Sequence, residues 1–239
     1  MEREVKGLPN GEPFFRHNLG VPTRYAERAR IVVEKLEAHY GPVVMTGRFD
    51  PMDELISCIL SQHTSDKNSF PAFDRLKVAY PTWEQMLAAP QGDIAQVIQS
   101  VGLANQKSKA IQAALRQIQL KTGGFTIDFL GEMPLEKALE WLEALPSVGP
   151  KTSAIVMNFA FDKPAIPVDT HVYRVGQRLG FIPKKLDANK AHPYVRKRIP
   201  ADLAHAFHMQ LIQLGRDTCR APKPKCADCP VKDLCPSNR

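Results

Sequence analysis

The sequence of 239 residues predicts an all-α protein with two helical subdomains. Apolar residues recur about every three or four positions through most of the chain, which is the spacing of one helix face. No segment alternates apolar and polar residues as a half-buried strand would, and no Asn-Gly or Asp-Gly turn joins two strand-like segments. Glycines, prolines and capping side chains also mark several expected helix ends.

The first two expected helices have boundaries marked by their sequence. The first would end at Gly41, because glycine readily adopts the left-handed conformation that follows a helix. The second would begin at Asp50-Pro51, a capping carboxylate followed by a first-turn proline. Their apolar faces consist of Tyr25, Ala29, Val32, Val33, Leu36 and Tyr40 in the first helix and of Leu55, Ile56, Ile59 and Leu60 in the second.

Six more helices are expected farther along the chain. Asp93 is placed to cap the first of them, Gly123-Gly124 to end the second, and Pro134 to open the third. The apolar faces of these three are Ile94, Val97, Ile98 and Val101; Ile111, Ala114, Leu115 and Ile118; and Leu135, Leu139, Leu142 and Leu145. The last three helices are expected within residues 155–161, 172–179 and 203–214.

The charge balance is basic, with 32 Lys and Arg residues against 25 Asp and Glu residues and a net charge of +7. This balance fits a nucleic acid partner, and it fits a merely soluble basic protein equally well. No stretch approaches the roughly 20 apolar residues of a transmembrane helix, so we expect no membrane partner. Residues 1–16 lack the apolar core of a secretion signal, so we expect a cytoplasmic protein whose cysteines stay reduced.

Four of the five cysteines crowd the C-terminal end with the spacing C-x6-C-x2-C-x5-C: Cys219, Cys226, Cys229 and Cys235. Thiolates this close in sequence can converge on one metal centre. Zinc usually takes two C-x2-C pairs, whereas this loop has one pair and two single outer ligands. A cubane iron–sulfur cluster takes one thiolate at each iron, and the spacing favours it modestly. Disulfides are the alternative, disfavoured in a reducing compartment, and Cys58 is interpreted as a buried apolar residue.

The loop between the first two of these cysteines is stiff and basic. Pro222 and Pro224 alternate there with the cations Arg220, Lys223 and Lys225. Such a loop suits the binding of backbone phosphates, and it is also compatible with a solvated surface segment. The choice between the two depends on the motifs elsewhere in the chain.

Residues 142–154 are predicted to form two helices joined by a tight turn, Leu145-Pro146-Ser147-Val148-Gly149-Pro150. The N–H groups at the start of the second helix would point outward and could hold a phosphate without reading base sequence. Lys151 lies in the first turn of that helix, where the dipole disfavours a cation and favours the neutral amine that a nucleophile needs. From local sequence alone, an exposed lysine without a chemical role is the simpler interpretation.

Asp169 stands in Val168-Asp169-Thr170-His171, immediately before the expected helix 172–179. The position predicts a helix N-cap. It also places a carboxylate at a helix start, where it would face the same cleft as Lys151. The two roles are compatible.

Three motifs, in this order, resemble those of the endonuclease III family of DNA repair glycosylases. They are Leu-Pro-Ser-Val-Gly-Pro-Lys-Thr at 145–152, Val-Asp-Thr-His at 168–171 and the four-cysteine loop. The resemblance runs from about residue 25 to residue 237 and includes the segments 60–66 and 101–103. Because three independent motifs coincide in register, the resemblance is specific.

This resemblance implies a helix-hairpin-helix glycosylase fold. A six-helix barrel domain would occupy residues 46–163, and a cluster domain would be built from residues 1–45 and 164–239. Lys151 matches the Schiff-base lysine and Asp169 the aspartate beside it. The four cysteines match the ligands of a [4Fe–4S] cluster. The implied partner is double-stranded DNA with damaged bases or abasic sites, bound by a monomer across the cleft between the domains.

The resemblance also assigns residues to DNA binding. The hairpin contributes Ser147, Val148 and Gly149. Two segments would fill the gap left by an extruded base, and they contribute Gln62 or His63 and Leu103. The basic loop contributes Arg220, Lys223 and Lys225. Two positions depart from the family pattern, because a glycine is usual where Ser147 stands and a glutamine or asparagine where His63 stands. Residues 1–24 have no counterpart, and either a flexible arm or a cover for the DNA face would fit them.

The function implied is base-excision repair of oxidised pyrimidines, with an AP-lyase activity that cleaves the strand by β-elimination. Three alternatives stay open. A monofunctional mismatch glycosylase is disfavoured by Lys151, which such relatives typically lack. A non-catalytic damage-binding protein is disfavoured by the presence of both Lys151 and Asp169. A zinc-stabilised helical protein unrelated to DNA would require the three motifs to coincide by chance.

Overall fold

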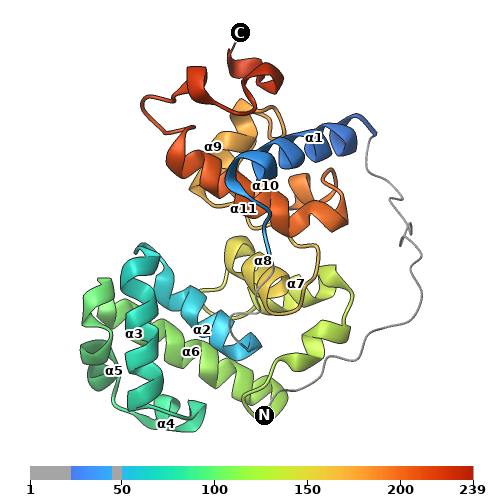
Figure 1. Ribbon diagram of the computed structural model, residues 1–239. Coiled ribbons are helices and arrows are strands. Elements are labelled where there is room, and N and C mark those ends of the chain that lie inside the picture. The colour runs from blue at the N-terminus through green and yellow to red at the C-terminus, as the bar shows by residue number, and fades with distance from the viewer. Residues whose placement is uncertain (1–22, 45–49, 239) are drawn as a thin grey trace, which may run out of the picture.

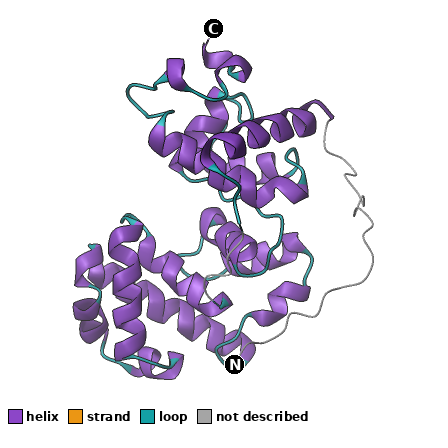
Figure 2. Cartoon of the chain, viewed as in Figure 1, coloured by secondary structure: helices purple, strands orange, loops and turns teal. Residues whose placement is uncertain are grey.

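The computed structural model describes residues 23–44 and 50–238, and the described chain is almost entirely helical. No strand occurs within these two ranges, as Figure 2 shows. The predicted all-α class is therefore confirmed. The expected N-terminal arm falls mostly on residues 1–22, and the expected domain limit at 45–46 also lies outside the described residues.

The helices form two groups (Figure 1), and each group buries its own hydrophobic core. The first core runs from Met52 to Ala165 and is formed by the helices that follow one another through the first two thirds of the chain. These are α2 (Pro51–Ser61), α3 (Asp66–Ala79), α4 (Trp83–Ala88), α5 (Gln91–Val97), α6 (Ala104–Thr122), α7 (Leu135–Glu143) and α8 (Pro150–Phe159), with the 3-10 turns η1 (Gln99–Val101) and η2 (Asp128–Glu132).

The second core joins both ends of the described chain. Its helices are α1 (Thr23–Tyr40), α9 (Thr170–Arg178), α10 (Ala188–Arg196) and α11 (Ala204–Asp217), with the short turns η3 (Ala201–Leu203), η4 (Cys226–Asp228), η5 (Lys232–Leu234) and η6 (Pro236–Asn238). Helix α1 packs beside α11, although it is far from it in sequence (Figure 1). Arg28 of α1 donates to the carbonyl of Leu234 at 2.7 Å and to that of Leu179.

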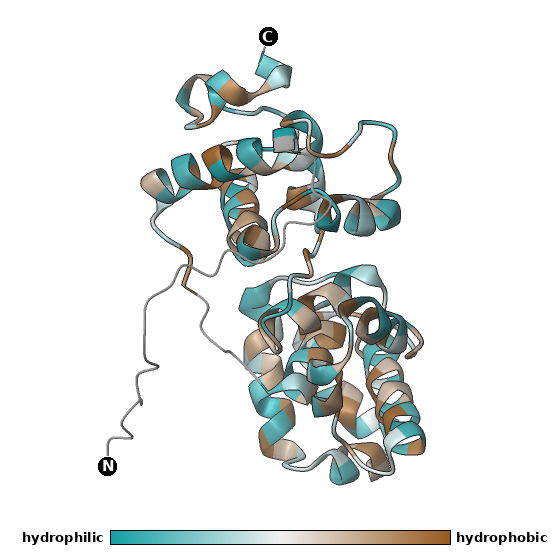
Figure 3. Ribbon diagram, turned by 90° about the vertical axis from the view of Figure 1, so that its right-hand side faces the viewer, coloured by the Kyte–Doolittle hydropathy of each residue, from teal (hydrophilic) through white to brown (hydrophobic). Residues whose placement is uncertain are grey.

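Brown and teal alternate along the helices in Figure 3, as expected for helices that bury one face. The change from the first core to the second falls between Ala165 and Ile166. This is close to the predicted domain limit at residues 163 and 164, and we keep the limits 46–163, 1–45 and 164–239 as a proposal.

Local signals located some helix ends and missed others. Asp50 caps α2 by accepting from the Asp53 N–H at 2.7 Å, and Gly123 ends α6 with a φ of 74°. The prediction that Asp93 caps a helix is wrong, since α5 begins at Gln91 after Pro90 and Asp93 lies inside its first turn. A carboxylate is stabilised there by the helix dipole, so the same residue type suits both positions.

Three helices, α3, α4 and α10, were not among those expected. Helix α4 had a readable signal, a capping box in which the Thr82 hydroxyl and the Gln85 amide oxygen each accept from the other residue's backbone N–H. Prolines lie inside the other two, Pro71 in α3 and Pro193 in α10. A proline ordinarily marks a helix boundary, and this obscured both helices.

Candidate active site

Helices α7 and α8 form the predicted hairpin. Leu145 and Val148 of the connecting turn point into the first core, with exposed fractions of 3% and 7%. The Ser153 hydroxyl of α8 donates to the Glu143 carboxylate of α7 at 2.8 Å, which ties the two helices together. Gly149 occupies the N-cap position of α8 and provides no side chain to satisfy the first N–H groups. The hairpin is therefore packed against the first core, and the start of α8 is suited to hold an anion.

Ser147 adopts a left-handed backbone conformation, with a φ of 64°. This conformation costs an L-residue about 1 kcal/mol and costs glycine almost nothing, which explains why glycine is the usual residue at this position of the hairpin. The Gln62 amide donates to the Ser147 carbonyl at 2.8 Å. The contact joins the loop after α2 to the hairpin turn and helps to hold the strained residue.

Strained backbone is concentrated at the predicted DNA-contact residues. Four described residues other than glycine have a positive φ, and three of them are His63, Leu103 and Ser147. His63 is exposed at the end of α2, and Leu103 is 51% exposed immediately before α6. Strain of this kind persists only where the surrounding structure imposes it, and it is often found at functional sites.

The two predicted catalytic residues each begin a helix. Lys151 is exposed in the first turn of α8. Asp169 is half-buried at the N-cap of α9, where one carboxylate oxygen accepts from the Val172 N–H at 2.7 Å. The predicted N-cap is confirmed, and the second carboxylate oxygen takes no part in that bond.

A buried histidine of α11, His208, lies within electrostatic reach of both residues. Burial lowers the pKa of His208 to about 4, the Asp169 carboxylate acts to raise it, and the Lys151 ammonium acts to lower it. The structure thus brings Lys151 and Asp169 into one electrostatic neighbourhood from two different helices.

The segment that leads to Asp169 is held by buried polar side chains. The His208 ring donates to the carbonyl of Pro167 at 2.8 Å, and the ring of His192 accepts from the Val168 N–H at 3.2 Å. The Asn158 amide of α8 donates to the carbonyl of Ala165 at 2.7 Å. These bonds fix the backbone just before the carboxylate, so they position it relative to α8.

Sequence reasoning missed His192, His208 and Asn158. Each contacts a residue between 7 and 41 positions away, in a segment without regular secondary structure. An interior histidine on an apolar helix face gives no local signal of such a partner. Only the tertiary arrangement identifies these residues.

The two buried histidines predict an acid-sensitive fold. Burial lowers the pKa of His192, like that of His208, from an ordinary 6.5 to about 4. Below pH 6.5 the unfolded chain therefore binds protons that the folded chain does not, and stability falls until the pH reaches about 4. At pH 5 we expect a loss of about 2 kcal/mol for each histidine relative to pH 7.5, measured by urea unfolding.

Matched variants test the source of this loss. Asn mimics the ring Nδ1 position as donor or acceptor but does not titrate, so His192→Asn and His208→Asn should each flatten the pH dependence. Exposed His39 provides the control, and His39→Asn should leave the slope unchanged. Equal slopes in all four proteins would contradict the assignment.

The four C-terminal cysteines line one small pocket of about 70 Å³. All five cysteines of the chain are free, so the disulfide alternative is not realised. Burial raises the pKa of the Cys229 thiol, and the nearby Cys219, Cys235 and Cys226 raise it further. Among the described residues, no group of three or more His, Cys, Asp or Glu side chains is arranged to hold a single metal ion. Cys58 lies apart from the pocket on α2 and is 7% exposed, as expected of a buried apolar residue.

Helix α9 connects the cysteine loop to the segment that carries Asp169. The Arg174 guanidinium donates to the carbonyl of Cys219 at 3.0 Å. The Arg178 guanidinium donates to the sulfur of Cys219 at 3.3 Å and to the carbonyl of Arg220 at 2.8 Å. One helix therefore begins at the predicted catalytic carboxylate and holds the cysteine loop with its second half.

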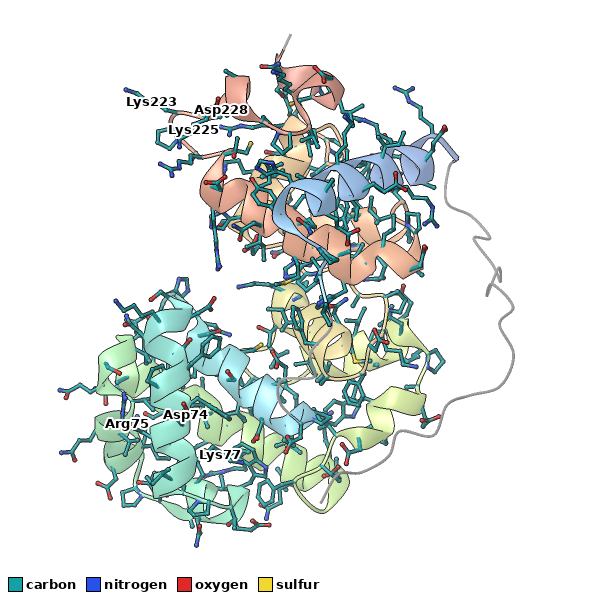
Figure 4. The ribbon with its side chains drawn as sticks, in the orientation of Figure 1. Asp74, Arg75, Lys77, Lys223, Lys225 and Asp228 are labelled. Atoms are coloured by element: carbon teal, nitrogen blue, oxygen red, sulfur yellow. The ribbon has the colours of Figure 1, made fainter. Side chains whose placement is uncertain are left out.

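The basic loop lies on the surface of the part of the molecule that holds the second core. Arg220, Lys223 and Lys225 are all exposed, and Figure 4 shows Lys223 and Lys225 at the outer edge of the loop. Arg220 donates from Nε to the carbonyl of Asp217 at 2.9 Å, so its remaining donors stay at the surface. No helix in the described part of the chain is long and apolar enough to cross a membrane.

The chain is similar to known DNA repair proteins. The family described as "HhH-GPD superfamily base excision DNA repair protein" matches residues 56–201. The chain is 34% identical over 209 residues to endonuclease III of Thermotoga maritima, covering 87% of this chain and 91% of the relative. It is 33% identical over 210 residues to endonuclease III of Escherichia coli K12, covering 88% and 95%. An Arabidopsis thaliana relative is 33% identical over 189 aligned positions, and the match covers 75% of this chain and 64% of the longer relative.

Solved structures share the same fold. A trapped covalent intermediate of endonuclease III with DNA superposes with a TM-score of 0.76 at 29% identity, over 89% of this chain and 96% of the other. A thermostable thymine-DNA glycosylase superposes with a TM-score of 0.74 at 25% identity, over 89% and 97%.

Proposed function

Because the chain belongs to the endonuclease III family of HhH-GPD base excision DNA repair proteins, we propose that it is a bifunctional DNA glycosylase and AP lyase acting on oxidised pyrimidines. The observation that carries the proposal is the placement of Lys151 and Asp169. An exposed amine begins the second hairpin helix, and a carboxylate with one uncommitted oxygen begins α9 in the same electrostatic neighbourhood.

Binding would use contacts that do not read base sequence. The backbone N–H groups around Ser147, Val148 and Gly149 would hold one phosphate of double-stranded DNA, and Arg220, Lys223 and Lys225 would hold others. Because a damaged base stacks poorly, extruding it from the duplex costs less free energy. The gap that remains would be filled by Leu103 from one strained turn and by Gln62 or His63 from another.

The chemistry would begin with proton transfer from the Lys151 ammonium to the Asp169 carboxylate. The neutral amine forms a bond to C1′ of the sugar as the glycosidic bond breaks, and the base leaves with that electron pair and takes up a proton. Asp169 supplies that proton, and the carboxylate so regenerated stabilises the positive charge that develops on the sugar. Opening of the sugar ring gives a Schiff base, and loss of a proton from C2′ then breaks the C3′–O bond, cutting the strand 3′ to the lesion.

The residues around the cysteine pocket fit a [4Fe–4S] cluster. Four thiols line one small cavity, and a cubane cluster takes one thiolate at each of its four irons. A bound cluster would supply stability to the cysteine loop by joining its four thiolates. Cys219, Cys226, Cys229 and Cys235 would hold it, and Arg178 would donate a hydrogen bond to the Cys219 sulfur.

Removing a ligand should remove the cluster. We expect the purified protein to be brown, to absorb at about 400 nm and to contain about four irons per chain. Cys235→Ala should lose this absorbance, because one of the four ligands is missing. It should also melt at a lower temperature, because Cys235 packs against the second core. Cys58→Ala is the control and should keep both the iron and the absorbance. A colourless wild-type protein that contains zinc would contradict the assignment.

Borohydride trapping tests the proposed function. A covalent protein–DNA adduct is expected on a duplex with one thymine glycol and on a duplex with one abasic site. Binding to both duplexes without an adduct would indicate a monofunctional or non-catalytic protein. Because one structural neighbour is a thymine-DNA glycosylase, a duplex with thymine opposite guanine is included, and base release there without an adduct would favour the mismatch alternative.

A further inference from the structure

Lys107 is a buried lysine that the proposed mechanism does not use. It lies one turn into α6, close in sequence to the strained Leu103, and its exposed fraction is 4%. Burial lowers the pKa of its ammonium, since the charged form loses hydration. Lysine is almost never fully buried without a partner, so the contacts of this side chain need an explanation.

Lys107 makes two hydrogen bonds to the turn before α6. Its side-chain ammonium donates to the carbonyl of Val101 at 3.0 Å, and its backbone N–H donates to the carbonyl of Leu103 at 3.0 Å. Val101 ends the 3-10 turn η1 and is 3% exposed. The ammonium therefore satisfies a carbonyl at the end of one helical segment while its own backbone belongs to the start of the next.

The turn at Gly102 and Leu103 has a backbone conformation that residues with a side chain rarely adopt. Gly102 has a φ of 69° and a ψ of 160°, and Leu103 has a φ of 50° and a ψ of 31°. The Leu103 side chain is nevertheless 51% exposed, so burial of leucine does not stabilise the turn. Two residues before Leu103, the buried Val101 carbonyl accepts the Lys107 bond, so this side chain is anchored next to the turn that presents Leu103.

We propose that Lys107 is a positioning residue that holds Leu103 outward as the wedge which enters the duplex when a damaged base is extruded. This inference rests on the proposed function and deepens it, because it names the residue that orients the gap-filling side chain. Lys107 would act through the backbone of residues 101–103 and would touch neither the DNA nor the reacting atoms.

The test compares two DNA substrates with different needs for a wedge. Release of thymine glycol from a duplex leaves a gap that must be filled, whereas cleavage of a single-stranded oligonucleotide at an abasic site does not. Lys107→Met keeps the length of the side chain and removes its hydrogen bond. Lys109→Met is the matched control, an exposed lysine on the same helix.

We expect Lys107→Met and Leu103→Ala each to lower single-turnover base release about tenfold, with single-strand cleavage within about twofold of wild type. The double variant should be no slower than the slower single variant, because both changes remove one wedge. Lys107→Arg, which keeps a buried donor, should recover most of the rate, and Lys109→Met should match wild type.

Gly102→Ala gives an independent route to the same turn. A Cβ there meets nothing within 4 Å, so its effect comes from backbone strain at a φ of 69° rather than from a clash. It should reproduce the loss on duplex and the unchanged single-strand cleavage, which tests the turn as the wedge support. If Lys107→Met does not fold, Lys107→Arg tests the lysine itself.

The other outcomes separate two failures. With an active wild type, three results overturn the positioning role. The variants at 102 and 107 could leave base release unchanged, they could slow both substrates equally, or their rate losses could multiply with that of Leu103→Ala in a double variant. A wild type inactive on both substrates overturns the proposed function itself.

Discussion

Lys151→Ala is expected to eliminate covalent trapping and to lower strand cleavage at an abasic site by at least about 10³-fold. In the proposed mechanism this side chain supplies the nitrogen of the Schiff base, so without it the covalent intermediate cannot form. Lys151 is exposed in the first turn of α8, so the substitution leaves no cavity and no unpaired buried group. Stability should change by no more than about 0.5 kcal/mol.

A second lysine separates loss of the nucleophile from loss of charge. Lys190 is also exposed and also lies in the first turn of a helix, α10. Lys190→Ala removes the same charge from the same type of position, and trapping and cleavage should remain within about twofold of wild type. Gel-shift binding of an abasic duplex should survive in both variants. If Lys151→Ala still yields a borohydride adduct at the wild-type rate, another amine is the nucleophile.

The sequence was informative where chemistry depends on residues that are neighbours in the chain. The hairpin turn at 145–150, the Asp169 cap and the four-cysteine spacing each depend on local contacts, and the structure contains the two helix-start geometries as expected. The same holds for Gly123, whose backbone freedom ends α6. Local rules failed for Asp93, because first-turn and N-cap carboxylates look alike in sequence.

Tertiary contacts account for what the sequence did not indicate. Gln62 was assigned to the gap-filling segment, and its bond to Ser147 depends on two loops 85 residues apart in the chain. The buried pair His192 and His208 fixes the backbone before Asp169 from two helices of the second core. Such residues have no local signature, so helix caps and turns could be predicted from sequence and the tertiary contacts that position them could not.

Replacing the Asp169 carboxylate by an amide should lower activity and leave stability unchanged. Asn is as good an N-cap as Asp, and its side-chain oxygen can accept from the Val172 N–H in the same way. Asp169→Asn should therefore keep the melting temperature of the wild type. It should slow base release about 10²- to 10³-fold, because the proposed mechanism needs a carboxylate there to accept the Lys151 proton and to stabilise the developing sugar cation.

Two further substitutions separate the cap from the charge. Asp169→Ala removes both, so it should be as slow as Asp169→Asn and also less stable by about 1 kcal/mol. Asp187 caps α10 by accepting from the Asn189 N–H at 2.8 Å, and Asp187→Asn should change neither rate nor stability. Single-turnover base release and thermal unfolding of the four proteins check the whole set. If Asp169→Asn releases base at the wild-type rate, the carboxylate is only a helix cap, and the charge that assists Lys151 must come from another residue.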